Sequence, residues 1–253
     1  MSGGSPTREW FREWFGEEYL ALYPHRNEEE AREAVALFRS VSSIAPGAPV
    51  LDLACGAGRH LRELRSAGID ASGLDLSGTL LRNARSASAT DPLIRADMRR
   101  IPLASGAVDG LTSFFTSFGY FADPDDDLQV LAEMARVLSP GGSFMLDFLN
   151  AGRVRRDLVA EDQRTIGGRR VRQTREIEEG IVVKRILIEP VDGGHARDFE
   201  ERVRLYAPDD LVSLLARVGL RTDHRFGDYR GAAFGEGSQR LILAGRLAAG
   251  RAG

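Results

Sequence analysis

Two glycines, Gly56 and Gly58, form a turn between an apolar segment at residues 50–53 and a segment with helical spacing that begins near residue 59. Glycine lets the backbone approach a ligand closely, and the first N–H groups of a helix attract polar or anionic groups. Dinucleotide enzymes use a similar turn, so the glycines alone predict only that a nucleotide-like ligand binds at the end of a buried strand.

Acidic residues at the ends of the next two apolar segments narrow the choice of ligand. Asp75 follows Gly56 by 19 residues, where a carboxylate can accept both hydroxyls of a ribose. Asp97 and Met98 follow the third apolar segment, where the edge and the face of an adenine would lie. The structural alternatives are that Asp75 caps a helix starting near residue 77 and that Asp97 is a turn residue. The combination favours an adenosine-bearing cofactor.

Two residues near the glycine turn bear on whether the ligand is a dinucleotide and whether catalysis uses a cysteine nucleophile. Leu61 takes the place of the third glycine of a dinucleotide motif, so a pyrophosphate would meet a side chain there. Cys55 is interpreted as a packing residue rather than a nucleophile, because no histidine stands where it could activate the thiol. The sequence shows no cysteine–histidine cluster of the kind that holds a metal ion, so no metal site is expected.

Four segments resemble the successive motifs of class I S-adenosylmethionine (SAM)-dependent methyltransferases. They read VLDLACGAGRH, GLDLS, ADMRRIPLASGAVDG and LARVLSPGGSFMLDF, and they cover residues 50–149. The resemblance implies SAM as the cofactor and S-adenosylhomocysteine as its product. It also implies positions for individual residues: Ala54, Gly56 and Gly58 beside the methionine part of SAM, Asp75 at the ribose diol, Leu76 and Met98 around the adenine, Asp97 at its amine, and Phe115 at the sulfonium.

More narrowly, the chain resembles small-molecule methyltransferases that include aminosugar N-methyltransferases and relatives of glycine N-methyltransferase. The resemblance rests on YLALYPHR at residues 19–26, FTSFGYF at residues 115–121 and VRLY at residues 203–206. It implies that Tyr23 and Arg26 hold the carboxylate of SAM. Tyr120, just past the fourth strand, is the candidate for orienting the methyl acceptor.

The elements that position these residues predict an α/β fold. Strand and helix patterns alternate five times between residues 50 and 149, which indicates a parallel sheet. A helix at 208–218 and strands at 221–226 and 240–247 would complete a Rossmann-like, seven-stranded, mostly parallel sheet with helices on both faces. Residues 164–206 contain three alternating segments, which predict an inserted antiparallel three-stranded β-subdomain.

The expected domain division follows from these elements. Aromatic residues between positions 10 and 23 suit short amphipathic helices with an aromatic face, so residues 1–45 are predicted to be an N-terminal helical lid. Residues 46–152 and 207–253 would form the SAM-binding domain. Residues 153–206 would form the inserted subdomain, which is expected to cover the methyl-donating side and to provide a homodimer contact.

The composition indicates which partners and which cellular compartment to expect for the protein. The 253 residues are 43% hydrophobic and 28% charged, with a net charge of −3 that gives no general attraction to a polyanion. No apolar segment approaches the roughly 18 residues that a membrane span needs, and the first residues lack the apolar core of a signal peptide. Cys55 is the only cysteine, which fits a reducing cytoplasm. We expect a cytoplasmic protein without membrane contact.

The reaction itself requires little from the protein beyond alignment. Methyl transfer is an in-line displacement at a sulfonium, and holding the reacting groups in line supplies much of the rate. An amine acceptor needs only to arrive unprotonated, whereas a hydroxyl needs a base. The candidate bases are His25, His60, His195, His224, Asp147 and Asp228. The predicted acceptor is therefore a small molecule that presents an amine nitrogen or a hydroxyl oxygen.

Two other functions stay open at this point. One is an RNA or other nucleic-acid methyltransferase, because eight arginines lie between residues 153 and 175. Three glutamates follow these arginines directly, which favours a solvated strand face and no nucleic-acid partner. The other is a SAM-binding protein whose chemistry is not methyl transfer.

Overall fold

The seven strands of the larger sheet come from two separate parts of the chain. The computed structural model describes residues 9–23 and 28–249. In spatial order the strands are β10 (Leu220–Phe226), β11 (Arg240–Leu247), β5 (Leu138–Leu149), β4 (Val108–Ser113), β1 (Pro49–Leu53), β2 (Asp70–Asp75) and β3 (Leu93–Arg95). β1 to β5 are parallel, β11 is antiparallel to β5, and β10 is antiparallel to β11. The predicted seven-stranded, mostly parallel sheet is confirmed.

Helices cover both faces of this sheet because successive side chains of its strands point to opposite faces. In β5, Phe144 and Leu146 pack in a hydrophobic cluster with α6 (Pro124–Val137) and α8 (Pro208–Arg217). Met145 packs on the other side in a cluster with α3 (Glu28–Val41) and α4 (Arg59–Ser66). The other helices of the described residues are α1 (Phe11–Trp14), α2 (Glu17–Leu22), α5 (Gly78–Ala87) and α7 (Ala151–Asp157). None of these described helices is both long and apolar enough to cross a membrane.

α4 lies close against the larger sheet because β2 carries no side chain at Gly73. A Cβ atom at Gly73 would lie 2.7 Å from Cys55 Sγ and 2.8 Å from Leu61 Cδ2. In dinucleotide-binding proteins the third glycine of the motif allows this close packing of helix on strand. Here Leu61 occupies that place on the helix, and the glycine stands on the facing strand instead.

We expect Gly73→Ala to lower the free energy of unfolding by about 1–3 kcal/mol, the usual cost of over-packing a core. Cys55 and Leu61 are both buried, so neither side chain has free space into which to move. Gly235→Ala is the control, because nothing lies within 4 Å of a Cβ atom at that position. Urea unfolding of the two variants measures the difference. Equal stability of both variants would show that α4 moves away from β2 without cost.

The inserted subdomain is a four-stranded antiparallel sheet, so the prediction of three strands was wrong by one. Its strands are, in order, β6 (Glu161–Ile166), β7 (Arg169–Glu178), β8 (Ile181–Pro190) and β9 (Arg197–Arg204). The missed strand, β6, is a polar and mostly exposed edge strand, without the apolar alternation by which a strand is recognised. The usable signal was the pair Gly167 and Gly168, whose φ angles of 54° and 73° form the two-residue turn into β7.

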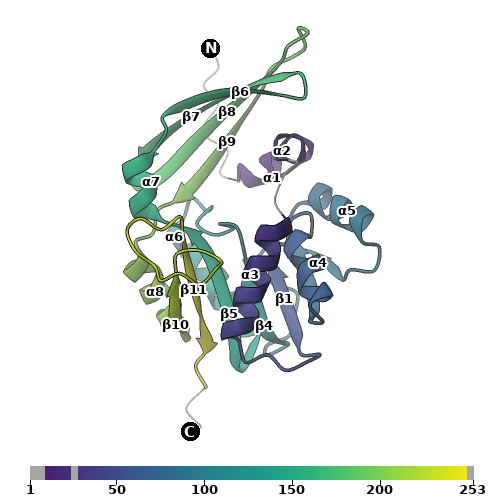
Figure 1. Cartoon of the computed structure of the whole chain (residues 1–253), viewed down its shortest axis with the longest axis vertical. Coiled ribbons are helices and arrows are strands. Elements are labelled where there is room, and N and C mark those ends of the chain that lie inside the picture. Colours follow the sequence, from purple (N-terminus) through teal and green to yellow (C-terminus); the bar gives the residue numbers. More distant parts are fainter. Residues whose placement is uncertain (1–8, 24–27, 250–253) are drawn as a thin grey trace.

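The two faces of this smaller sheet have different surroundings. Its inner face packs on α1, where the ring centroids of Trp14 and Phe199 are 5.0 Å apart and Trp14 Nε1 donates to Glu201 Oε1 at 2.5 Å. Its outer face carries ion pairs, such as Arg185 Nη2 with Glu178 Oε1 at 3.2 Å. In Figure 1 the smaller sheet stands above the larger one, with α1 and α2 beside it. The outer face is therefore charged.

A buried carboxylate joins the end of the insertion to α6. Asp127 lies in the first turn of α6 and is fully buried. Its Oδ2 accepts hydrogen bonds from Tyr206 Oη at 2.7 Å and from Arg204 Nε at 3.3 Å. Burial raises the pKa of Asp127 to about 6, although the Tyr206 hydroxyl and the Arg204 guanidinium act in the opposite direction.

This carboxylate is expected to make the stability of the protein depend on pH. Because its pKa in the fold lies above the ordinary 3.8, the folded state binds more protons than the unfolded state between about pH 4 and 6. Stability therefore falls as the pH rises through this window, by about 2–3 kcal/mol for this group. Urea unfolding of wild type and Asp127→Asn from pH 4 to 7 should show the wild type losing stability relative to the variant. A difference that stays constant with pH would contradict this assignment.

Candidate functional site

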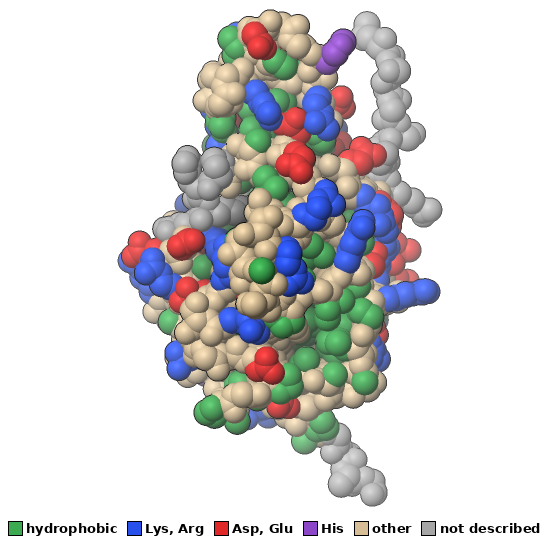
Figure 2. Space-filling view, turned by 90° about the vertical axis from the view of Figure 1, so that its right-hand side faces the viewer, with side chains coloured by type: hydrophobic (Ala, Val, Ile, Leu, Met, Phe, Trp, Pro, Cys, Tyr) green, Lys and Arg blue, Asp and Glu red, His purple; other side chains and the backbone are tan. Residues whose placement is uncertain are grey.

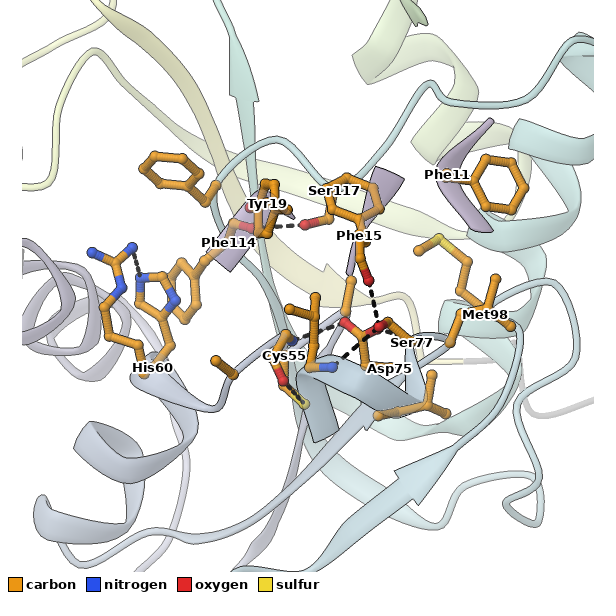
Figure 3. Close-up of a pocket in the computed structure, with 18 of the residues that line it drawn as sticks. Phe11, Phe15, Tyr19, Cys55, His60, Asp75, Ser77, Met98, Phe114 and Ser117 are labelled. Atoms are coloured by element: carbon orange, nitrogen blue, oxygen red, sulfur yellow. Dashed lines mark hydrogen bonds between the residues drawn. The ribbon is translucent and has the colours of Figure 1, made fainter. Parts of the chain in front are cut away.

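A cavity of about 440 Å³ opens where β1, β2 and β4 end, since its wall includes the residues that directly follow these strands. This is the edge at which open α/β sheets bind ligands. Figure 3 shows Asp75 and Ser77 in the middle of the wall, His60 on one side and Met98 on the other. Nine of the predicted site residues line the cavity: Tyr23, Ala54, Gly56, Asp75, Leu76, Asp97, Met98, Phe115 and Tyr120.

Other residues named from the sequence are not among the lining residues. Gly58 is the N-cap of α4 and has a φ of 75°. A Cβ atom there would lie 3.1 Å from Ala84 Cβ, so Gly58 allows α4 and α5 to pack closely. Leu61 is buried in the core instead of facing the cavity, so the expected obstruction of a pyrophosphate by this side chain was wrong. Arg26 lies outside the described residues.

The carboxylate of Asp75 is fixed between the glycine turn and the start of α5. The Gly56 N–H donates to Oδ2 at 2.8 Å, and the Ser77 N–H donates to Oδ1 at 2.7 Å. Burial raises the pKa of Asp75, while these two N–H groups act in the opposite direction. An ionised carboxylate has about four acceptor positions, so each oxygen can also accept a hydrogen bond from a ligand in the cavity.

Asp97 is held in place by Arg99. Arg99 Nε donates to Asp97 Oδ1 at 3.1 Å, and Arg99 Nη2 donates to Asp97 Oδ2 at 2.7 Å. The same guanidinium pairs with Glu9 at 2.7 Å and with Asp126 at 3.0 Å. Burial alone would raise the pKa of Asp97, but the hydrogen bonds and the charge of Arg99 outweigh it and the pKa is lowered. Asp97 is therefore an ionised acceptor with a fixed orientation.

The turn after β1 places a residue other than glycine in the left-handed region. Ala54 has a φ of 58°, which is uncommon for a side chain with a Cβ atom. Cys55 beside it is buried, and burial raises the pKa of its thiol well above the usual range. A buried thiol of this kind is a poor nucleophile, which supports the interpretation of Cys55 as a packing residue.

The hydroxyls of the two predicted tyrosines have partners on the protein. Tyr23 Oη accepts from Lys184 Nζ at 2.7 Å, which connects the cavity wall to the smaller sheet. Tyr120 Oη donates to the carbonyl of Thr116, and its ring stacks on Phe15 with the centroids 5.8 Å apart. Both side chains thus support the wall in addition to lining it.

His60 is the candidate base that the structure brings to the cavity. It lies in the first turn of α4, is buried, and stacks on Phe114 with the ring centroids 4.5 Å apart. The other candidates within the described residues are not among the lining residues; they are Asp147, His195, His224 and Asp228. His25 lies outside the described residues. Within residues 9–23 and 28–249, no group of three or more His, Cys, Asp or Glu side chains is placed to hold a metal ion.

Much of the wall consists of residues that the sequence did not assign to the site. Phe11, Phe15 and Tyr19 come from the N-terminal segment, where the sequence predicted only the aromatic face of a lid. Further lining residues are Arg59, Arg62, Ser77, Asn83, Phe114 and Ser117. Within the described part of the chain, every lining residue lies between positions 11 and 121, so the smaller sheet there supports α1 from behind and does not itself line the cavity.

Comparison with known proteins agrees with this site. A family described as a methyltransferase domain matches residues 50–142. The chain is 27% identical over 220 residues to dTDP-3-amino-3,4,6-trideoxy-alpha-D-glucopyranose N,N-dimethyltransferase of Streptomyces venezuelae, covering 83% of this chain and 91% of that protein. The CcbJ methyltransferase from Streptomyces caelestis has a similar fold, with a TM-score of 0.79 at 19% identity over 93% of this chain and 98% of that one. The sugar N-methyltransferase KedS8 from Streptoalloteichus also has a similar fold. Its TM-score is 0.72 at 23% identity, and the match covers 98% of this chain and 96% of that one.

The matched segment and the cavity coincide. Residues 50–142 include β1 to β4, the glycine turn, Asp75 and Asp97, which together make the central part of the wall. The similarity of fold extends beyond this segment, since the match with the CcbJ methyltransferase covers 93% of this chain. The chain therefore matches a methyltransferase domain at residues 50–142 and resembles SAM-dependent methyltransferases over most of its length.

Proposed function

We propose that this methyltransferase transfers the methyl group of SAM to the amine nitrogen of an amino sugar. The proposal is carried by an aromatic-walled cavity beside Asp75, in a chain that aligns over 83% of its length with an amino-sugar N,N-dimethyltransferase. Aromatic faces attract cations, and a sulfonium donor carries a positive charge. The chain aligns with 91% of that relative, so the likeness extends well beyond the methyltransferase domain.

The residues of the cavity fit SAM, which supplies a methyl group on a positively charged sulfonium. Asp75 would accept from the ribose hydroxyls, because its buried carboxylate is fixed at the end of β2 and retains acceptor positions. Leu76 and Met98 would flank the adenine. Asp97 would accept from the adenine amine while Arg99 keeps it ionised.

The methionine part of the cofactor would lie along the turn after β1. Ala54 and Gly56 line the cavity there, and Gly58 would contribute through the close packing of α4. Phe115 would stand next to the sulfonium. Tyr23 is a candidate for the carboxylate, together with the predicted Arg26.

The protein would promote the reaction by alignment and by exclusion of water. Rings from α1, α2 and the segment after β4 line part of the cavity, and closing a site with such groups expels water from the reacting atoms. Tyr120 is the candidate for orienting the acceptor from the mouth of the cavity. An amine that arrives unprotonated needs no further group for the displacement.

A second candidate function is O-methylation, and His60 is the observation that favours it. This histidine lines the cavity beside Phe114 and is in reach of a ligand there. It would take the proton of a hydroxyl acceptor as a general base.

We also propose that the insertion acts on the acceptor indirectly. Lys184 donates to Tyr23, and Glu201 accepts from Trp14, so the smaller sheet holds the N-terminal helices against the cavity.

The division into a lid at 1–45, a SAM-binding domain at 46–152 and 207–253, and a subdomain at 153–206 stays a prediction. A homodimer through the smaller sheet, the cytoplasmic location and the lack of a nucleic-acid partner also stay predictions. Figure 2 shows positive and negative side chains interspersed over the face that it displays.

The test uses SAM labelled at its methyl group. The purified protein is incubated with dTDP-linked amino sugars, with the matching sugars that carry a hydroxyl in place of the amine, and with RNA. We expect label on the amine nitrogen only, and we expect His60→Ala to retain most of this activity. Label on the hydroxyl sugars that disappears in His60→Ala would establish O-methylation instead. Label in RNA, or SAM binding without transfer to any acceptor, would overturn the proposal.

A further inference from the structure

A strained segment forms part of the cavity wall. Phe115 and Thr116 lie two and three residues after the end of β4 at Ser113 and have φ angles of 64° and 54°. Residues with a Cβ atom rarely adopt this left-handed region, and they remain in it only where the surroundings enforce it. The side chain of Phe115 lines the cavity. Whatever holds these two residues therefore determines the shape of the wall.

Asp147, near the carboxyl end of β5, contacts both strained residues. The Phe115 N–H donates to Asp147 Oδ2 at 2.6 Å, and the Thr116 N–H donates to the main-chain carbonyl of Asp147 at 3.2 Å. The Asp147 side chain is completely buried and does not line the cavity. It thus lies behind the wall, in contact with the backbone that forms it.

The orientation of the Asp147 carboxylate is fixed by the C-terminal part of the chain. Tyr229 Oη donates to Oδ2 at 2.5 Å, and Arg240 Nη1 donates to the same oxygen at 3.0 Å. The guanidinium of Arg240 also lies 4.9 Å from the centroid of the Phe115 ring and donates to Glu30 Oε1 at 2.5 Å. One arginine therefore contacts both the carboxylate and the ring that the carboxylate positions.

We infer that Asp147 is a positioning residue for methyl transfer: it holds Phe115 and Thr116 in the left-handed conformation and so sets where the Phe115 ring stands in the cavity. This inference rests on the proposed function in one respect, namely that this cavity is where transfer occurs. It replaces the role of general base that the sequence left open for Asp147, because the carboxylate is completely buried and does not line the cavity.

The test compares Asp147→Ala with wild type in two independent measurements. In the protein without ligand, hydrogen exchange of the Phe115 amide should be about tenfold faster or more in the variant, because its acceptor is gone. The kcat should fall about tenfold or more with the KM for SAM within about threefold, since a misplacement of about 1 Å at a reacting centre can cost about 10²-fold. Asp147→Asn should restore most of both, because its carboxamide oxygen can accept from the same donors.

Asp127→Ala is the matched control. Asp127 is an equally buried carboxylate that accepts from a tyrosine and an arginine, but its partners belong to the insertion. The Phe115 amide should exchange within about twofold of wild type in this control. Equal acceleration in both alanine variants, or none in Asp147→Ala, would overturn the inference.

If Asp147→Ala fails to fold, the wild-type protein alone tests whether the backbone at Phe115 and Thr116 is held in place. The amides of Phe115 and Thr116 should then be strongly protected in the ligand-free protein, although they lie in a turn beside a cavity. Exchange at the rate of an unstructured chain would overturn the inference. The hydrogen-exchange measurements need neither SAM nor an acceptor, so failure of the amino-sugar proposal leaves their result standing.

Discussion

Asp75→Ala is expected to weaken binding of SAM and S-adenosylhomocysteine about 10- to 100-fold while leaving the protein folded. Hydrogen bonds to a charged acceptor contribute about 1.5–3 kcal/mol each, and a ribose diol offers two. The substitution also removes the acceptor of the Gly56 and Ser77 N–H groups, so the glycine turn loses part of its support. Isothermal titration calorimetry with S-adenosylhomocysteine measures the change in affinity.

Asp75→Asn separates the two contributions in this experiment. Its amide keeps the shape of the carboxylate and one acceptor oxygen, but it lacks the charge, so its affinity should lie between those of wild type and Asp75→Ala. Far-UV circular dichroism and the melting temperature verify that each variant is folded. Unchanged affinity in a folded Asp75→Ala variant would mean that the ribose is held elsewhere.

Trp14→Ala should lower the free energy of unfolding by about 3–5 kcal/mol, the usual cost of truncating a buried aromatic side chain. The Trp14 side chain is completely buried between the N-terminal helices and β9, against Phe199 and Glu201. Urea unfolding measures the loss of stability. In the Trp14→Ala variant, the backbone amides of β9 should exchange hydrogen faster than those of β5.

The control for this substitution is Trp14→Phe, which keeps a ring against Phe199 but removes the donor to Glu201. It should cost clearly less than Trp14→Ala, because most of the stabilisation comes from burial of the ring. If Trp14→Ala unfolds at the same urea concentration as wild type, α1 contributes little to the core. The N-terminal segment would then behave as the separable lid that the sequence predicted.

The larger sheet could be predicted from the sequence because its strands are covered on both faces. Such strands are nearly continuous apolar segments, and the glycine turn and the acidic residues mark where they end. β6 could not be recognised in this way, because an edge strand open to solvent is under no pressure to alternate apolar and polar residues. The glycines of its hairpin, Gly167 and Gly168, are the remaining signal for this strand.

The sequence predicted the residues around the adenosine part of the cofactor better than the residues that form the rest of the cavity wall. Residues such as Asp75 lie next to the motifs, so their spacing was enough to bring them to the cavity. By sequence alone Asp147 is a candidate base, because sequence spacing does not show whether a side chain near the end of a strand reaches a ligand or lies beneath the backbone. Its neighbours Phe144 and Leu146 pack on the α6 face, so alternation along β5 places Asp147 on the face of Met145.

The position of β11 has a consequence for how the chain acquires its fold during synthesis. This strand is the last in sequence, yet it lies between β5 and β10. Until residues 240–247 have left the ribosome, β5 keeps an unpaired edge, which is a template for pairing with another chain. Arg240 is the first residue of the same strand, so the group that orients Asp147 behind the Phe115 wall also arrives last. A product truncated before residue 240 would therefore combine an aggregation-prone edge with an unformed cavity wall.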